Sequence, residues 1–62
     1  MDSKTVIRAL EKAGWRRVRM KGSHAQFRHP DKPQTVTVPD PRRDLAPGTL
    51  KSIERQSGMR FT

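Results

Sequence analysis

Apolar residues recur along the first fourteen positions at the spacing of an amphipathic helix. They follow the i, i+1, i+4, i+7 pattern of one helical face and are Val6, Ile7, Leu10 and Ala13. Asp2 or Ser3 can cap the start of this helix, and Gly14 suits the left-handed position at its end. The pattern therefore predicts a short helix that buries one face.

After Gly14 the apolar period changes from helical spacing to two, which is typical of strands. Three such stretches, "WRRVRM", "SHAQFRH" and "QTVTV", are separated by the turn sequences "KG" and "PDKP". The predicted inward residues are Val18, Met20, Ala25, Phe27, Val36 and Val38. The predicted outward residues are Arg17, Arg19, His24, Gln26, Arg28, Thr35 and Thr37. This alternation predicts an antiparallel three-stranded meander with one face in solvent.

A loop rich in proline and charge, residues 39–48, leads to a second helix that starts near Pro47 and ends near Gly58. Its inner stripe and the residues expected at the core or its edge are Leu45, Leu50, Ile53, Ser57, Trp15, Met20, Met59 and Phe61. The chain thus reads as one α+β domain, residues 1–62, in the order α-β-β-β-α. Both helices are expected on one face of the sheet, which leaves the other face open.

The charge of the chain indicates what kind of partner its surface binds. There are 14 Lys and Arg against 6 Asp and Glu, for a net charge of +8 and a pI near 11.5. Such a charge attracts polyanions, and we expect RNA as the partner, with an anionic membrane or an acidic protein as the other candidates. No apolar run approaches the roughly 20 residues that cross a bilayer, so we expect a cytoplasmic protein without membrane contact.

His24 is the candidate reactive group on the open face. An imidazole takes and returns protons near neutral pH, and cations beside it can hold a phosphate. This combination suits cleavage of RNA at a 2′-hydroxyl without a metal, although a strand histidine among arginines is also an ordinary solvated residue. His29 has the opposite parity and lies roughly 17 Å along the strand, so we expect it to pack at the strand end.

The sequence gives no support for a metal site or a cofactor. Cysteine is absent, and Asp31, Asp40 and Asp44 lie in loops without a recognised ligand spacing. We therefore expect no metal and no cofactor. Trp15 can either stack on a base or cover the core, and covering the core is the favoured interpretation.

Four segments in this order resemble the HicA family of small toxins from bacterial toxin–antitoxin pairs. They are "IRALEKAGWRRVRM", "KGSHAQFRHP", "TVTVPDP" and "DLAPGTLKSI". The resemblance implies a double-stranded-RNA-binding-domain-like fold, a metal-independent mRNA endonuclease and a HicB-like antitoxin partner. It also implies that the catalytic histidine is His24, within Gly22-Ser23-His24. The expected RNA-binding surface comprises Arg17, Arg19, Lys21, Gly22, Ser23, Gln26 and Arg28.

Two positions depart from the family pattern. Members often have a second histidine after Gly-Ser-His, where this chain has Ala25, and a histidine after Val-Pro, where it has Asp40. An ionised Asp40 neither donates a proton nor attracts phosphate. The alternatives are a noncatalytic or degenerate RNA-binding module of the same fold and a basic interaction protein. Double-stranded RNA-binding modules usually carry several lysines at the start of the last helix, where this chain has Lys51 alone.

Overall fold

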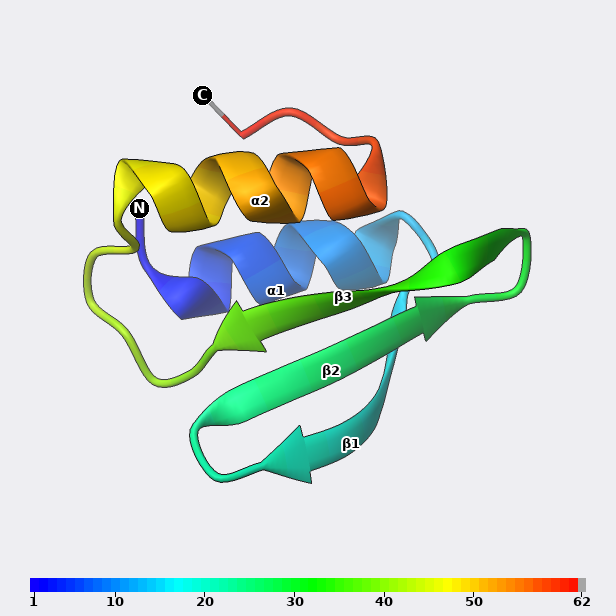
Figure 1. Ribbon diagram of the computed structural model, residues 1–62, viewed down its shortest axis with the longest axis horizontal. Helices are drawn as coiled ribbons and strands as arrows, with labels where there is room; N and C mark the ends of the chain where they lie inside the picture. Colours follow the sequence, from blue (N-terminus) through cyan, green and yellow to red (C-terminus); the bar gives the residue numbers. More distant parts are fainter. Residues whose placement is uncertain (62) are drawn as a thin grey trace.

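The chain forms two helices and a three-stranded antiparallel sheet in the computed structural model, which describes residues 1–61. Helix α1 spans Ser3–Lys12 and helix α2 spans Pro47–Ser57. Strands β1 (Arg16–Lys21), β2 (His24–His29) and β3 (Lys32–Pro39) pair in the order β1-β2-β3, as Figure 1 shows. The predicted order α-β-β-β-α is therefore confirmed.

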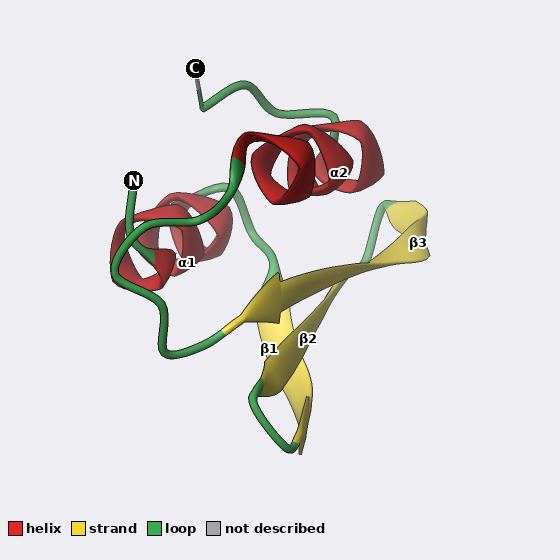
Figure 2. Cartoon of the chain, turned by 60° about the vertical axis from the view of Figure 1, so that its left-hand side comes forward, coloured by secondary structure: helices red, strands yellow, loops and turns green. Residues whose placement is uncertain are grey.

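Both helices lie on the same side of the sheet, and the hydrophobic core fills the space between the two layers (Figure 2). The apolar core residues of α1 and α2 come from the predicted stripes, and Ala25, Phe27, Val36 and Val38 of the sheet are fully buried. Ala13 is an exception: the apolar pattern predicts it on the inner face of the first helix, but it is the exposed C-cap residue that follows α1. Trp15 is 2% exposed, so its ring covers the core and is not available to stack on a base. The opposite face of the sheet is left without a covering layer.

The ends of the helices use the residues that the sequence suggested. Asp2 is the N-cap of α1, and its carboxylate accepts a hydrogen bond from the backbone N–H of Thr5 at 2.9 Å. Gly14 follows α1 with φ at +100°, and a Cβ there would lie 2.8 Å from Nε2 of His29. Both the backbone angle and the close approach therefore require glycine. None of the described helices is long and apolar enough to span a membrane.

Strand β1 is the part of the sheet where the prediction of an inward apolar face is wrong. Val18 and Met20 are 58% and 45% exposed, so neither belongs to the core. The helices pack chiefly against β3, and β1 lies at the far edge of the sheet, beyond their reach (Figure 1). The pairing of β1 with β2 also shifts by one residue between Arg17 and Arg19, which makes a β-bulge at Val18.

The other edge of the sheet, at β3, is closed by helix α2. The side-chain oxygen Oε1 of Gln56 accepts the backbone N–H of Thr37 at 3.1 Å. The backbone carbonyl of Gln56 accepts the side-chain amide of Gln34 at 2.9 Å. A backbone donor that would otherwise face solvent at the edge of the sheet is therefore satisfied within the chain.

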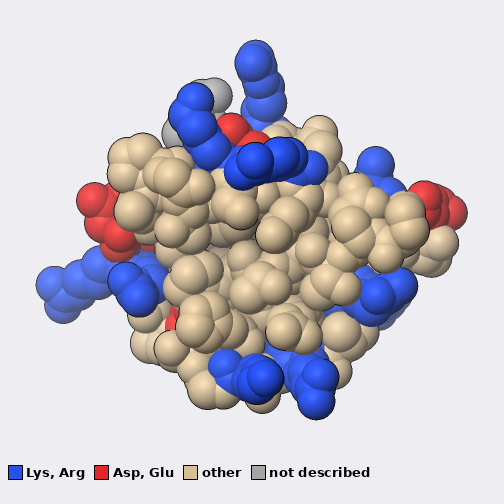
Figure 3. Space-filling view, viewed as in Figure 1, with Lys and Arg blue, Asp and Glu red and all other residues tan. Residues whose placement is uncertain are grey.

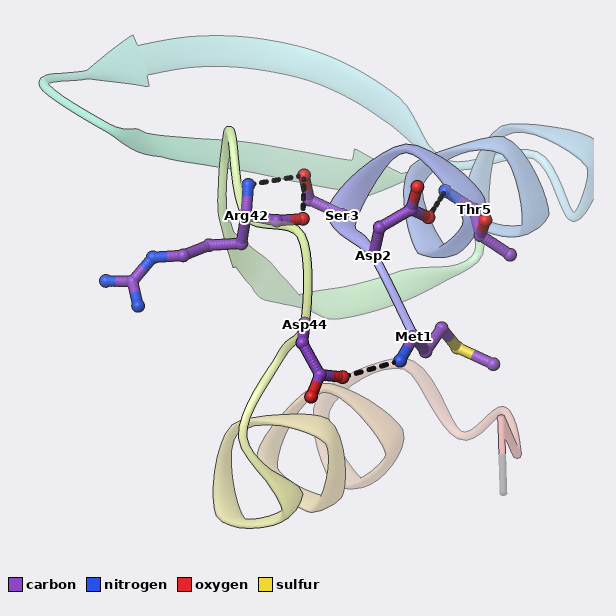
Figure 4. Close-up of polar contacts among 6 residues, drawn as sticks. All are labelled: Met1, Asp2, Ser3, Thr5, Arg42 and Asp44. Atoms are coloured by element: carbon purple, nitrogen blue, oxygen red, sulfur yellow. Dashed lines mark hydrogen bonds and ion pairs between the residues drawn. The ribbon is translucent and has the colours of Figure 1, made fainter.

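The start of α1 is fastened to the loop that follows β3. The buried hydroxyl of Ser3 donates to Asp40 at 2.7 Å and accepts the backbone N–H of Arg42 at 3.0 Å. The N–H of Ser3 also donates to the carbonyl of Arg42 at 2.9 Å. Figure 4 shows Ser3 beside Arg42, with a parallel contact from the terminal amine of Met1 to Asp44 at 2.9 Å.

Candidate RNA-cleavage site

His24 is the first residue of β2, directly after the turn Gly22-Ser23, and its side chain is exposed. It lies opposite Lys21 of β1 and Pro39 of β3 in the antiparallel register. Residues that lie opposite each other in such a register project from the same face. The register therefore places the ammonium-bearing side chain of Lys21 beside His24 on the open face of the sheet.

The turn before His24 is held from the end of β3. The backbone N–H of Asp40 donates to the carbonyl of Ser23 at 2.8 Å. The carboxylate of Asp40 is turned to α1, where it accepts the hydroxyl of Ser3. Asp40 thus acts as a link between the turn and α1, and this contact explains why an acidic residue is accommodated beside a basic surface.

Further along the open face, polar and cationic side chains form a continuous surface with His24 at one end. Arg19 lies opposite Gln26, which lies opposite Thr37 of β3. Arg28 donates from its guanidinium to the hydroxyl of Thr35 at 3.3 Å and to the carbonyl of Pro33 at 3.5 Å. These two contacts hold the Arg28 side chain over the β2–β3 pair.

The bulge in β1 exchanges the roles of two neighbouring arginines. Arg17 lies opposite the buried Phe27, so it projects from the side of the sheet that the helices occupy. Arg16 lies opposite Arg28 and therefore projects from the open face. The prediction that Arg17 shares the face of His24 is wrong, and Arg16 is a cation of that face which the predicted outward residues did not include.

His29 packs at the end of β2, as its position in the alternation of the strand predicted. Its Nε2 lies 3.0 Å from the carbonyl of Ala13, and its Nδ1 accepts the backbone N–H of Asp31 at 3.0 Å. Its ring also meets Trp15 edge to face, with the centroids 5.2 Å apart. His24 and His29 therefore lie at opposite ends of β2 and on opposite faces, and they do not form an acid–base pair.

The described residues contain no group of three or more His, Cys, Asp or Glu side chains placed to hold a metal ion. In the view of Figure 3 the Lys and Arg side chains stand mostly around the rim of the molecule, whose middle is uncharged. The chemistry that the open face offers is thus one exposed imidazole among cations.

Comparison with known proteins agrees with this fold. A family model described as "HicA toxin of bacterial toxin-antitoxin" matches residues 3–59. The solved structure of the HicA3 and HicB3 toxin-antitoxin complex contains a chain that is similar to this one with a TM-score of 0.84 and 30% sequence identity. The alignment covers 100% of both chains. No curated protein sequence matches the chain.

The α-β-β-β-α fold and the family match define a toxin of a bacterial toxin–antitoxin pair. Within that class the chain belongs to the HicA toxin family.

Proposed function

We propose that the protein is a metal-independent endoribonuclease that cleaves mRNA, with His24 as the catalytic residue. The observation that carries the proposal is the position of His24, which is exposed at the start of β2 and lies opposite Lys21 on the open face of the sheet. Membership of the HicA family supports the same assignment. The RNA-binding residues that we propose are Lys21, Gly22, Ser23, Arg19, Gln26 and Arg28.

In this reaction the neutral imidazole of His24 removes the proton of a ribose 2′-hydroxyl. The 2′ oxygen attacks the adjacent phosphorus, and the bond from phosphorus to the 5′ oxygen of the next nucleotide breaks. Cationic side chains beside His24 stabilise the negative charge that develops on the phosphoryl oxygens. The departing 5′ oxygen takes a proton from the imidazolium, directly or through water. The products are a 2′,3′-cyclic phosphate and a 5′-hydroxyl end.

The test is cleavage of a labelled single-stranded RNA in EDTA by the wild type and by His24→Gln and His24→Ala. Loss of a positioned general base lowers the rate by about 10²–10⁴-fold, while the fold and the affinity for RNA should be retained. His29→Phe removes the other histidine from the opposite face and is the control, assayed at a temperature at which circular dichroism shows that it is folded. Cleavage by His24→Ala at the wild-type rate would contradict the mechanism. An inactive wild type that still binds RNA would instead support the noncatalytic module.

We propose further that a HicB-like antitoxin covers the His24 face. The similar chain comes from a complex with HicB3, and a strand face that carries Arg19 and Arg28 attracts carboxylates. The double variant Arg19→Glu, Arg28→Glu should weaken binding of the cognate antitoxin, measured by calorimetry. Unchanged affinity would move the interface to another face.

A further inference from the structure

An open hollow of about 630 Å³ lies at the end of the β1–β2 pair that is remote from His24. Arg16 and Val18 of β1 line it, with Arg28 and His29 of β2. Pro30 and Asp31 line it from the β2–β3 turn, and Lys32 and Pro33 from the start of β3. Its volume is within the range of about 300–1,000 Å³ that is usual for small-ligand sites. The hollow combines two guanidinium groups and Lys32 with the apolar surfaces of two prolines and a valine.

The two arginines of the hollow are brought together by the bulge. Without the extra residue at Val18, Arg16 would project toward the helix layer instead of lying opposite Arg28. Arg28 is already oriented by its bonds to Thr35 and Pro33, which use two of the five N–H donors of a guanidinium and leave the others for an anion. A guanidinium pair binds phosphate oxygens with two or more charge-assisted hydrogen bonds.

The distance from His24 to the hollow determines which nucleotide of a bound RNA strand the hollow can hold. Arg28 lies four residues after His24 on the same face of β2, which is about 13 Å at about 3.3 Å per residue. A phosphate held at His24 cannot also contact Arg28 and Arg16. The hollow therefore fits a nucleotide of the same strand that lies beyond the one being cleaved.

We infer that this hollow is a second nucleotide subsite, in which Arg16 and Arg28 hold a backbone phosphate of single-stranded RNA. The base of that nucleotide lies against Pro30, Pro33 and Val18. Asp31 is the acidic residue of the hollow, so the phosphate lies on the arginine side. This inference rests on the proposed function for its ligand, and it makes Arg16 a positioning residue of the reaction.

The first experiment measures binding and does not depend on cleavage. A fluorescent single-stranded octanucleotide is titrated into His24→Ala protein that also carries Arg16→Gln, Arg17→Gln or Arg55→Gln. Each variant loses one positive charge, but Arg55 lies on α2 and Arg17 projects from the helix side. We expect Arg16→Gln to weaken binding about fivefold at 0.1 M salt and to reduce the log–log salt slope by about 0.7. Arg17→Gln should have a smaller effect, and Arg55→Gln the smallest.

The second experiment measures cleavage with His24 intact. A dinucleoside monophosphate has no second phosphate, so Arg16→Gln should leave its kcat/KM unchanged while lowering that of the octanucleotide. Equal losses for both substrates, or equal binding by the Arg16 and Arg55 variants, would overturn the subsite. Weaker antitoxin binding by Arg16→Gln with unchanged RNA binding would also overturn it, because the hollow would then serve a protein partner. Failure of the His24 variants to lose cleavage would contradict the proposed mechanism alone, since the binding experiment is independent of it.

Discussion

At the scale of single residues, the two histidines differ in their hydrogen bonds and in their exposure to solvent. The Nδ1 atom of His29 accepts an N–H from Asp31, so the ring hydrogen must be on Nε2, where it donates to the carbonyl of Ala13. Both contacts fit the tautomer of the ring that carries its hydrogen on Nε2. His24 is exposed, and none of the hydrogen bonds described above involves its side chain. His29 therefore stabilises the fold through its hydrogen bonds, and His24 is the histidine to which we assign the proposed catalytic role.

Replacement of His29 by phenylalanine tests this division of roles. The variant keeps a ring against Trp15 but loses both hydrogen bonds, which leaves the carbonyl of Ala13 and the N–H of Asp31 without their partner. We expect the free energy of unfolding to fall by about 0.5–1.5 kcal/mol, measured by urea denaturation, because both hydrogen bonds are exposed and water partly replaces them. The matched variant His24→Phe changes an exposed position and should stay within about 0.5 kcal/mol of the wild type. Equal midpoints for the two variants would contradict the structural role of His29.

At the scale of elements, the helices could be predicted well because their signals are local. The apolar stripe, the cap at Asp2 and the glycines at both C-terminal ends act within one or two turns of the chain. The sequence does not reveal which residues of β1 face each side of the sheet, because this depends on a bulge in the pairing of β1 with β2. The exposure of Val18 and Met20 likewise depends on how far two short helices reach across the sheet. For the same reason the sequence indicated His24 and Arg28 but placed Arg17 on the wrong face and missed Arg16.

The cap of α1 makes a prediction about pH. Hydrogen bonds from Thr5, first from its side chain and second from its backbone N–H, hold the pKa of the Asp2 carboxyl below its ordinary value. The ionised cap therefore stabilises the fold above the unfolded pKa of about 3.9, and this stability is lost as pH falls through the lower, folded pKa. Asp2→Asn keeps a capping oxygen that does not titrate. The Tm advantage of the wild type over Asp2→Asn should accordingly shrink as the pH falls below about 3.9, and a constant difference would contradict it.

At the scale of the whole molecule, one buried hydroxyl joins parts of the chain that are far apart in sequence. Ser3 contacts Asp40 and Arg42, and Asp40 in turn supports the turn before His24 through Ser23. The start of α1, the loop after β3 and the candidate catalytic turn are thus connected by short hydrogen bonds. A net charge of +8 opposes the compact state, and such contacts help a chain of 62 residues to remain folded.

Ser3→Ala should weaken the contacts of the start of α1 with Asp40 and with Arg42. Removing the hydroxyl leaves the Asp40 carboxylate and the Arg42 N–H with fewer partners, and we expect a loss of about 1–3 kcal/mol in the free energy of unfolding. Amide hydrogen exchange should accelerate at Arg42 and Leu45, which bond to the start of the chain. Ser52→Ala on α2 is the control for loss of a serine hydroxyl. Unchanged exchange at Arg42 and Leu45 in Ser3→Ala would show that Ser3 does not join these parts.

The hydrogen bond between α2 and the edge of β3 affects where a partner can add a strand to the sheet. Gln56 already occupies the N–H of Thr37, so we expect an added strand to pair more readily along β1 than along β3. Four of the six residues of β1 are Arg or Lys, so a second copy of the chain is repelled there, whereas an acidic segment is attracted. We therefore expect a partner that extends the sheet to do so with one acidic segment, paired along β1.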